Sequence, residues 1–254
     1  MNIAKAILKI TLCIGIVVLV VVAAIAMKSR RCEDVKVTFL PKNNADILTQ
    51  SDVLELLAKN NIIYLNKKVK EVEPEKISAL LQKHAYVDEV SGVYFSGTTL
   101  RIDLKLKQPI LHLYSRQGNQ YLIDDKGRLL PYLPTMRERL LIANGAIAQE
   151  YKAGLTDTCN ATLHQLYTVA TAINRKPFLK AQISQLYVTG NPNSAIEILP
   201  VMGNQTILLG DTSNLENKLN TLQTVYKEGI SYMGFHKYSQ LDLRYKNRVV
   251  AKRR

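Results

Sequence analysis

Residues 86–107, YVDEVSGVYFSGTTLRIDLKLK, decide the fold of the first part of this 254-residue chain. From Leu100 onward, apolar residues alternate with charged ones, which is the period-two pattern of a strand with one apolar and one charged face. Tyr86 to Phe95 predicts a partner strand, and Ser96-Gly97-Thr98 between them is a turn signal. The stretch predicts an antiparallel hairpin whose apolar face needs cover.

Two short amphipathic helices upstream can supply that cover. Thr49 precedes Asp52 by three residues, a pattern typical of a capping box, and Asn60-Asn61 ends this first helix. Pro74 suits the first turn of a second helix. Apolar residues recur at helical spacing in both helices, at Val53, Leu56 and Leu57 and at Ile77, Leu80 and Leu81.

A strand is expected ahead of the helices, because Val35, Val37 and Phe39 alternate with polar residues before Pro41. The order strand, helix, helix, strand, strand predicts an α+β layer over residues 35–108. His84, which follows the second helix, has no other metal-ligand residue type clustered near it, and we interpret it as a boundary residue.

The remaining residues, 109–254, predict a second, mixed β domain with covering helices. The apolar patterns indicate strands at 110–114, 120–123, 183–189, 195–199 and 206–209, with helices at 163–173 and from Leu215 to Tyr226, the latter capped by Asn214. Asp124-Asp125-Lys126-Gly127 is a turn signal. Adjacent side chains in a strand point oppositely, so we interpret the two aspartates as turn residues and not as paired catalytic acids.

The chain closes on Leu241 to Ala251, LDLRYKNRVVA, which predicts one C-terminal edge strand. Leu241, Leu243 and Tyr245 share a face with two later apolar residues, and charged residues occupy the other face. Such a charged face is typical of a solvated sheet that resists edge-to-edge aggregation. The alternative is an open edge that receives a strand from another protein.

An uncharged apolar run, Ile10 to Met27, predicts a transmembrane helix, because eighteen residues at about 1.5 Å each cover most of a hydrocarbon core about 30 Å thick. A cleaved secretory signal is the alternative, but the run exceeds the usual apolar region of such signals. Residues 1–9 then form a cytoplasmic stub and residues 28–34 a juxtamembrane linker. Flanking charges are balanced, whereas long domains translocate regardless of charge, which favours an external C-terminal part.

Composition argues against several classes of function. The net charge of +13 comes from scattered basic residues without an aromatic-interleaved RNA-binding pattern, so we expect no nucleic-acid partner. Three cysteines give no disulfide framework. Phosphate-loop, hydrolase and zinc-site motifs are absent from the sequence, and its four histidines are far apart. We therefore expect a non-enzyme with no cofactor, no metal and no small-molecule substrate.

Several stretches resemble the FtsQ/DivIB family of bacterial cell division proteins. The matches are Asn61 to Leu65, Tyr86 to Val90 and Gly97 to Ile102 in a POTRA-like domain, and then Tyr121 to Gly127. The C-terminal layout is also similar: a Leu209-Gly210-Asp211 tract, a helix, and then Leu-Asp-Leu-Arg-Tyr. The resemblance implies a single-pass membrane anchor, a POTRA domain and a β domain, and it covers nearly the whole chain.

The resemblance also implies a function. Members of the family are divisome scaffolds of the inner membrane, with periplasmic C-terminal domains, concentrated at the division site. Their last strand receives a segment of FtsB, which is bound to FtsL, and by position Arg244, Tyr245 and Asn247 would be the recognition residues. The POTRA-like domain would contact other divisome membrane proteins of the FtsW and FtsI type.

Two alternatives remain open on the sequence. Envelope assembly and secretion components also carry POTRA-like domains, and they would act around the whole envelope. A membrane-anchored cell-wall hydrolase is the enzyme alternative, although the sequence lacks the motif of a nucleophile or a metal site.

Overall fold

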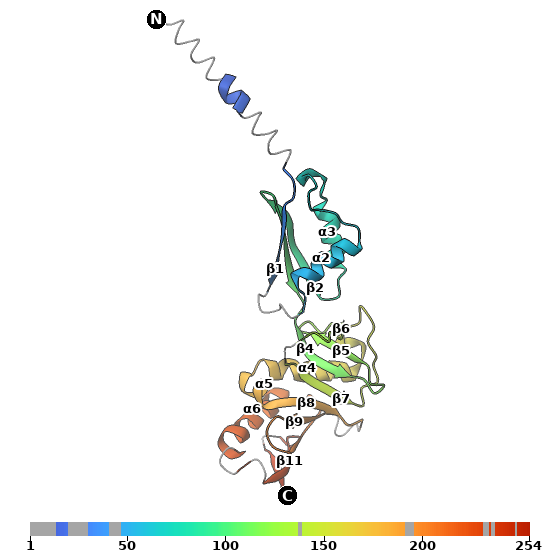
Figure 1. Cartoon of the computed structure of the whole chain (residues 1–254). Coiled ribbons are helices and arrows are strands. Elements are labelled where there is room, and N and C mark those ends of the chain that lie inside the picture. The colour runs from blue at the N-terminus through green and yellow to red at the C-terminus, as the bar shows by residue number, and fades with distance from the viewer. Residues whose placement is uncertain are drawn as a thin grey trace, which may run out of the picture. The chain divides into compact units, whose positions relative to one another are not determined.

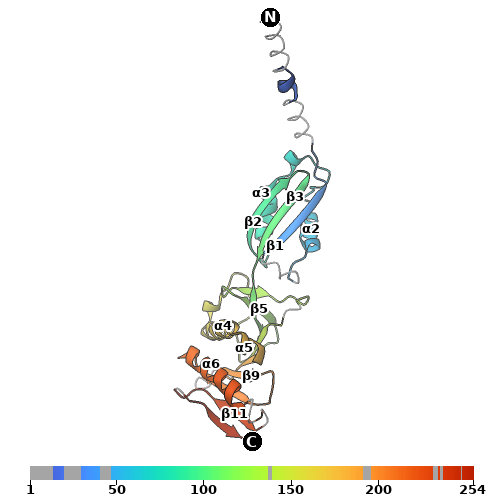
Figure 2. The ribbon, with the colours of Figure 1, turned by 90° about the vertical axis from the view of Figure 1, so that its left-hand side faces the viewer.

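A computed structural model describes residues 14–19, 30–40, 47–136, 139–190, 196–230, 234, 237–246 and 248–254. The chain divides into two compact units, Met1–Leu106 and Lys107–Arg254, called here the first unit and the second unit. Figures 1 and 2 show them from two directions.

The first unit combines a three-stranded sheet with helices packed on one face (Figure 1). Its elements are β1 (Asp34–Leu40), α2 (Gln50–Lys59), η1 (Val69–Glu71), α3 (Pro74–Gln82), β2 (Val87–Ser96) and β3 (Thr99–Leu106). The sheet order is β1-β3-β2, in which β3 is parallel to β1 and antiparallel to β2. The predicted order of strand, helix, helix, strand, strand is confirmed.

The alternation in β3 decides which face is covered. Leu100, Ile102 and Leu104 are fully buried, whereas the charged residues between them are half-buried or exposed. Burying apolar area is the main favourable contribution to folding, and here it comes from sheet residues packed against the α2 and α3 stripes. Thr49 caps α2 in the capping box that the sequence predicts: its side chain and that of Asp52 each accept a backbone bond.

The second unit is built on a sheet in which nine strands are described, in the order β12-β11-β10-β9-β8-β7-β4-β5-β6. The strands are β4 (Pro109–Tyr114), β5 (Gln120–Asp124), β6 (Leu129–Pro131), β7 (Leu141–Gly145), β8 (Ile183–Val188), β9 (Ile196–Pro200), β10 (Thr206–Gly210), β11 (Tyr238–Asp242) and β12 (Val250–Arg253). The sheet is mixed: β7 is parallel to both β4 and β8, and β10 is parallel to β11.

Helices cover the apolar face of this sheet. They are η2 (Asp157–Cys159), α4 (Ala161–Asn174), α5 (Pro177–Gln182) and α6 (Leu215–Thr224), which continues into the π-helical η4 (Val225–Ile230). Leu166 of α4, Leu179 of α5 and Leu219 of α6 are fully buried in one core with the sheet. The mixed β domain with covering helices is thus observed.

The turn predicted after β5 is confirmed. The carboxylate of Asp124 is fully buried and accepts hydrogen bonds from the backbone N–H of Lys126 and Arg128, at 3.0 and 2.7 Å. It also accepts one from Nε of Arg128 at 2.7 Å. Gly127 supplies the positive φ of 77° that the turn requires. The Asp124 side chain therefore organises a turn, as the sequence indicates.

The prediction of one continuous strand from Leu241 to Ala251 is wrong. The chain forms two antiparallel strands, β11 and β12, with Asp242 paired to Val250 next to the connection. The reason is local: a carboxylate oxygen of Asp242 accepts the backbone N–H of Arg244 at 3.0 Å, which turns the chain out of the strand. The C-terminal edge strand is consequently β12.

The predicted transmembrane helix falls largely outside the described residues. Residues 14–19 are helical, and residues 1–13 and 20–29, which include the stub and both ends of the run, are not described. Among the described residues, no helix combines the length and the apolar character needed to cross a membrane. Residues 28–34 are predicted to be a juxtamembrane linker. From Arg30 onward this segment pairs with the rest of the first unit, since Arg31 forms an isolated β-bridge with Lys68.

Candidate functional site

Sheet edges are the natural places to look for protein binding on this fold. An edge strand presents backbone N–H and C=O groups that a strand from another chain can pair with. Each unit contains one sheet, so the described structure has four edges to compare: β1 and β2 in the first unit, and β6 and β12 in the second.

Glutamine side chains occupy part of both edges of the first unit. The Gln50 amide donates to the carbonyl of Val35 at 3.1 Å and accepts the N–H of Val37 at 3.4 Å. The Gln82 amide does the same on β2, with the carbonyl of Asp88 at 3.0 Å and the N–H of Val90 at 3.1 Å. Each amide therefore takes the place of one residue of a neighbouring strand.

The β6 edge of the second unit is short and covered. The strand has three residues and ends in Pro131, which has no N–H to donate. The N–H of Leu129 bonds to the carbonyl of Leu155 at 3.0 Å, and Arg128 forms a bridge with Thr156. A loop of the same chain thus occupies this edge.

The β12 edge is the open one. All four residues of Val250–Arg253 are exposed, and β12 lies first in the strand order, with β11 as its neighbour among the described strands. One rim of β12 pairs with β11 from Val250 to Arg253. The other rim faces no strand in the described part of the chain, so its backbone groups are available for a partner.

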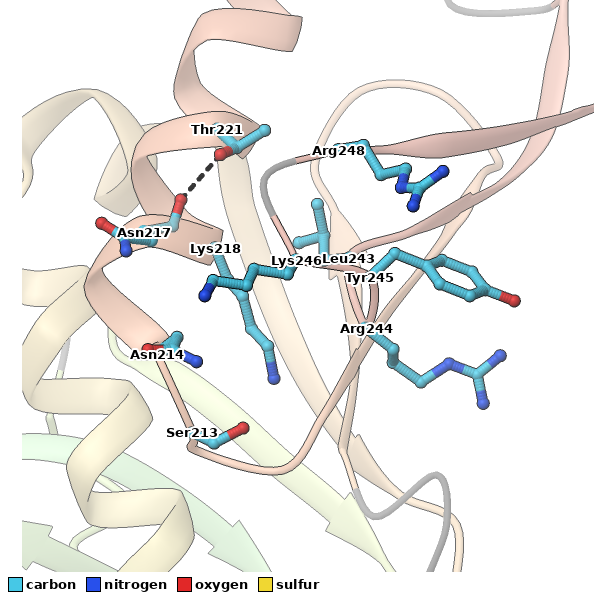
Figure 3. Close-up of a pocket in the computed structure, with 10 residues that line it drawn as sticks. All are labelled: Ser213, Asn214, Asn217, Lys218, Thr221, Leu243, Arg244, Tyr245, Lys246 and Arg248. Carbon is cyan, nitrogen blue, oxygen red and sulfur yellow. Dashed lines mark hydrogen bonds between the residues drawn. The ribbon is translucent and has the colours of Figure 1, made fainter.

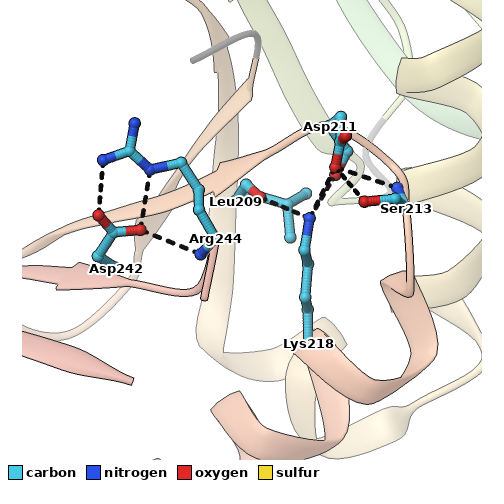
Figure 4. A network of polar contacts seen from close by, with 6 residues as sticks. All are labelled: Leu209, Asp211, Ser213, Lys218, Asp242 and Arg244. Atoms are coloured by element: carbon cyan, nitrogen blue, oxygen red, sulfur yellow. Dashed lines mark hydrogen bonds and ion pairs between the residues drawn. The ribbon is translucent and has the colours of Figure 1, made fainter. Parts of the chain in front are cut away.

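An ion pair holds the connection that leads into β12. Nε of Arg244 donates to Asp242 at 2.9 Å and Nη2 donates at 2.6 Å, so the pair is bidentate (Figure 4). Asp242 is only 8% exposed. The Arg244 guanidinium holds the pKa of the Asp242 carboxyl below its usual range, and the carboxylate raises the pKa of Arg244. The connection is therefore ordered by charge-assisted hydrogen bonds.

A second network fixes α6 against the end of β10. Nζ of Lys218 donates to the carboxylate of Asp211 at 2.9 Å, to the carbonyl of Asp211 at 2.9 Å and to that of Leu209 at 3.1 Å (Figure 4). The hydroxyl of Ser213 donates to the same carboxylate at 2.6 Å. These bonds, from Ser213 and then Lys218, lower the pKa of Asp211 to about 2.

The structure places two of the three recognition residues implied by the family resemblance. Arg244 and Tyr245 lie in the connection between β11 and β12, outside any strand, and Asn247 lies outside the described residues. Tyr245 is 51% exposed. Figure 3 shows Arg244, Tyr245 and Arg248 pointing away from α6, while Lys246 points toward it.

The hollow between α6 and the connection is small. It measures about 60 Å³ and is lined by polar and basic side chains, including Ser213, Asn217, Lys218 and Lys246. A volume of this order holds only a few waters. The site is therefore suited to a protein that lies across its surface rather than to an enclosed small molecule.

The period-two pattern of Leu241–Ala251 does not single out β12 as the exposed edge strand. Nor does the sequence pattern indicate the Lys218–Asp211 network that holds α6 next to the β11–β12 connection. One signal was available: the polar run Arg-Tyr-Lys-Asn-Arg, residues 244–248, is better suited to a connection than to the middle of a strand. Within the described residues, no group of three histidine, cysteine, aspartate or glutamate side chains is placed to hold a metal ion.

Comparison with known families agrees with this architecture. A POTRA-like domain model matches residues 30–105, and the model described as FtsQ/DivIB, C-terminal related matches residues 108–252. No curated protein matches the chain. Both matching domain models describe scaffold types of domain. The chain belongs to the FtsQ/DivIB family, and it is accordingly a division-associated scaffold.

Proposed function

We propose that this protein is a bitopic divisome scaffold that binds the FtsB–FtsL complex by adding a partner strand to the outer rim of β12. The observation that carries the proposal is the open β12 edge, since the other three described edges are wholly or partly occupied by the chain's own groups. Main-chain hydrogen bonds in such a complex supply affinity, and side chains beside the strand supply specificity.

Arg244 and Tyr245, with Asn247, are the residues we assign to partner recognition. Arg244 is held rigidly by Asp242, so little side-chain entropy is lost when a partner binds it. Tyr245 offers an exposed ring next to the edge, and aromatic side chains are frequent binding hot spots.

The membrane arrangement completes the proposal. Residues 10–27 form the inner-membrane anchor, and residues 1–9 remain in the cytoplasm. The rest of the chain is periplasmic at the division site. It comprises the linker at 28–34, the POTRA-like part at 35–108 and the β domain at 109–254. The POTRA-like part contacts division proteins of the FtsW and FtsI type. Confining the partners to one membrane raises their effective concentration, so an interface of modest affinity suffices. No catalytic step, cofactor or nucleic acid is involved.

A proline scan of β12 tests strand addition. Val250→Pro, Ala251→Pro, Lys252→Pro and Arg253→Pro are each made in the full chain, and capture of the FtsB–FtsL complex is measured. Successive N–H groups of an edge strand point alternately to the two rims. Prolines that remove an outward N–H should therefore abolish capture while circular dichroism and thermal unfolding stay unchanged. Capture by all four variants at the wild-type level contradicts the proposal.

Tyrosine substitutions test recognition separately from pairing. Tyr245→Ala should weaken binding by about tenfold, the usual effect of losing a tyrosine hot spot. Tyr187→Ala is the matched control, because Tyr187 is also exposed but lies on β8 in mid-sheet. Equal affinities for the two variants would remove Tyr245 from the recognition set.

A further inference from the structure

One loop of the first unit exposes two large aliphatic side chains that are two positions apart in the sequence. Ile63 is 64% exposed and Leu65 is 50% exposed. Tyr64 between them is half-buried near Cys32, and this burial raises the pKa of its hydroxyl. Two exposed aliphatic residues flanking a half-buried aromatic one suggest a loop that presents apolar surface outward.

Backbone hydrogen bonds tie this loop to the point where the chain enters the first unit. The N–H of Cys32 donates to the carbonyl of Lys67 at 2.9 Å, and the N–H of Asn66 donates to the carbonyl of Cys32 at 2.8 Å. The N–H of Val69 donates to the carbonyl of Arg30 at 3.0 Å. We call residues 30–32 the entry segment. Leu65 therefore directly precedes Asn66, whose backbone N–H is bonded to this segment.

The apolar run of the sequence ends close to that entry segment. Met27 is its last residue, and two residues separate it from Arg30. Three chain steps span about 11 Å at most, only a few Å more than the depth of one headgroup region, which is about 5 to 8 Å. An anchor at residues 10–27 would consequently hold the loop at the height of the headgroups.

Basic residues follow the two apolar ones in the loop and also occur in the segment that is hydrogen-bonded to it. Arg30, Lys67 and Lys70 are exposed, and Arg31 donates to the carbonyl of Asn66 at 2.6 Å. Lys68 pairs with Glu71 at 3.7 Å, and Glu33 accepts a hydrogen bond from Thr98, so these two carboxylates already have partners. A loop that exposes aliphatic residues together with basic ones is complementary to an anionic lipid surface.

We propose that the loop 61–70 docks on the membrane at which the chain emerges. Ile63 and Leu65 enter the interface of the bilayer, and Arg30, Lys67 and Lys70 face anionic lipid headgroups. This inference rests on the proposed function for the membrane anchor. Its consequence is that the first unit is fixed on the lipid surface by a second contact besides the anchor.

The sequence offers a sensitive probe, because the chain contains no tryptophan. Ile63→Trp and Leu65→Trp each introduce one indole into the full chain, reconstituted in phosphatidylcholine vesicles with or without phosphatidylglycerol. The indole emission should shift to shorter wavelength and be quenched by lipids with brominated acyl chains. Leu40→Trp is the matched control: Leu40 is 44% exposed but lies at the other end of β1, about 20 Å from Asp34.

Charge reversal tests the contribution of the basic residues of the loop to lipid binding. Lys67→Glu with Lys70→Glu should remove the part of the quenching that depends on phosphatidylglycerol. Lys83→Glu with Lys105→Glu, at exposed positions near the opposite end of the sheet, should leave that quenching unchanged.

The outcomes separate the two proposals. If the vesicles retain the full chain through an alkaline wash but the indole at position 63 or 65 stays unquenched, the docking inference alone is overturned. Loss of the chain from the vesicles overturns the anchor and the inference with it. Shielding of the indole only after FtsB–FtsL is added assigns the loop to a protein partner and overturns lipid docking.

Discussion

The Asp242–Arg244 pair is the residue-scale feature on which the proposed partner-recognition residues depend. Arg244→Ala should lower the free energy of unfolding of the second unit by about 1 to 3 kcal/mol, because a buried carboxylate loses its two side-chain donors and keeps only the backbone N–H. Urea denaturation measures this. The double variant Asp242→Asn, Arg244→Ala should be more stable than Arg244→Ala alone. If the single variant is as stable as the wild type, the pair does not order the connection.

The stability of the fold should depend on pH in acid because the pKa of Asp211 is lowered. Its folded-state pKa of about 2 lies below the ordinary value of 3.8, so the carboxylate stabilises the fold above about pH 4. That stabilisation is lost as the pH falls from about 4 to about 2. Asp211→Asn should therefore flatten the dependence of stability on pH in this window, measured by thermal unfolding. A slope equal to the wild type would show that Asp211 is not coupled to folding.

At the scale of elements, the two helix caps should respond differently to substitution. Thr49 completes a capping box on α2, so Thr49→Ala should cost about 1 kcal/mol. Asn214 occupies the equivalent position of α6 but has φ of 50° and makes no side-chain cap hydrogen bond. Asn214→Gly should thus be neutral or slightly stabilising, since glycine tolerates positive φ. Denaturation of both variants compares them directly, and equal losses would contradict this account of the caps.

The side-chain amides of Gln50 and Gln82 should protect the edges of the first unit's sheet from pairing with a strand of another molecule. Gln82→Ala exposes the backbone groups of Asp88 and Val90 to solvent or to another strand. The Val90 amide should then exchange hydrogen faster, and the protein should self-associate at lower concentration. Gln117→Ala, at an exposed loop position, is the control. Unchanged exchange at Val90 would show that the amide contributes no protection.

Elements with strong periodic patterns were predictable from the sequence. The 86–107 hairpin, the capping box of α2 and the Asp124 turn each follow from a few neighbouring residues. β7 was missed because Leu141–Gly145 is a short apolar run whose pairing depends on β4 and β8, far along the chain. α5 was missed because a proline three residues after Asn174 is typical of the end of a helix, whereas Pro177 here also begins the next one.

The candidate site was only partly predictable. Patterning located an apolar and a charged face in Leu241–Ala251, but not the turn that divides the segment. That turn depends on the Asp242 carboxylate accepting the N–H of Arg244, a side-chain choice that period-two reasoning does not contain. Which sheet edges stay open depends on tertiary positions: that of Leu155 at β6 in the second unit, and those of Gln50 and Gln82 in the first unit.

For the molecule as a whole, the arrangement of edges explains how a scaffold can be selective. Three of its four described edges are capped, shortened or covered by its own groups, which suppresses indiscriminate strand pairing. The fourth, β12, stays open beside a connection ordered by a bidentate ion pair. The proposed strand addition is thereby directed to the outer rim of β12.

Hydrogen–deuterium exchange of the full chain, with and without the FtsB–FtsL complex, tests strand addition at β12 most directly. The account predicts that complex formation slows exchange at amides within Val250–Arg253, because the outer rim acquires hydrogen-bond partners. Amides of the β6 edge should be unaffected. A stable complex that leaves exchange at Val250–Arg253 unchanged would contradict it.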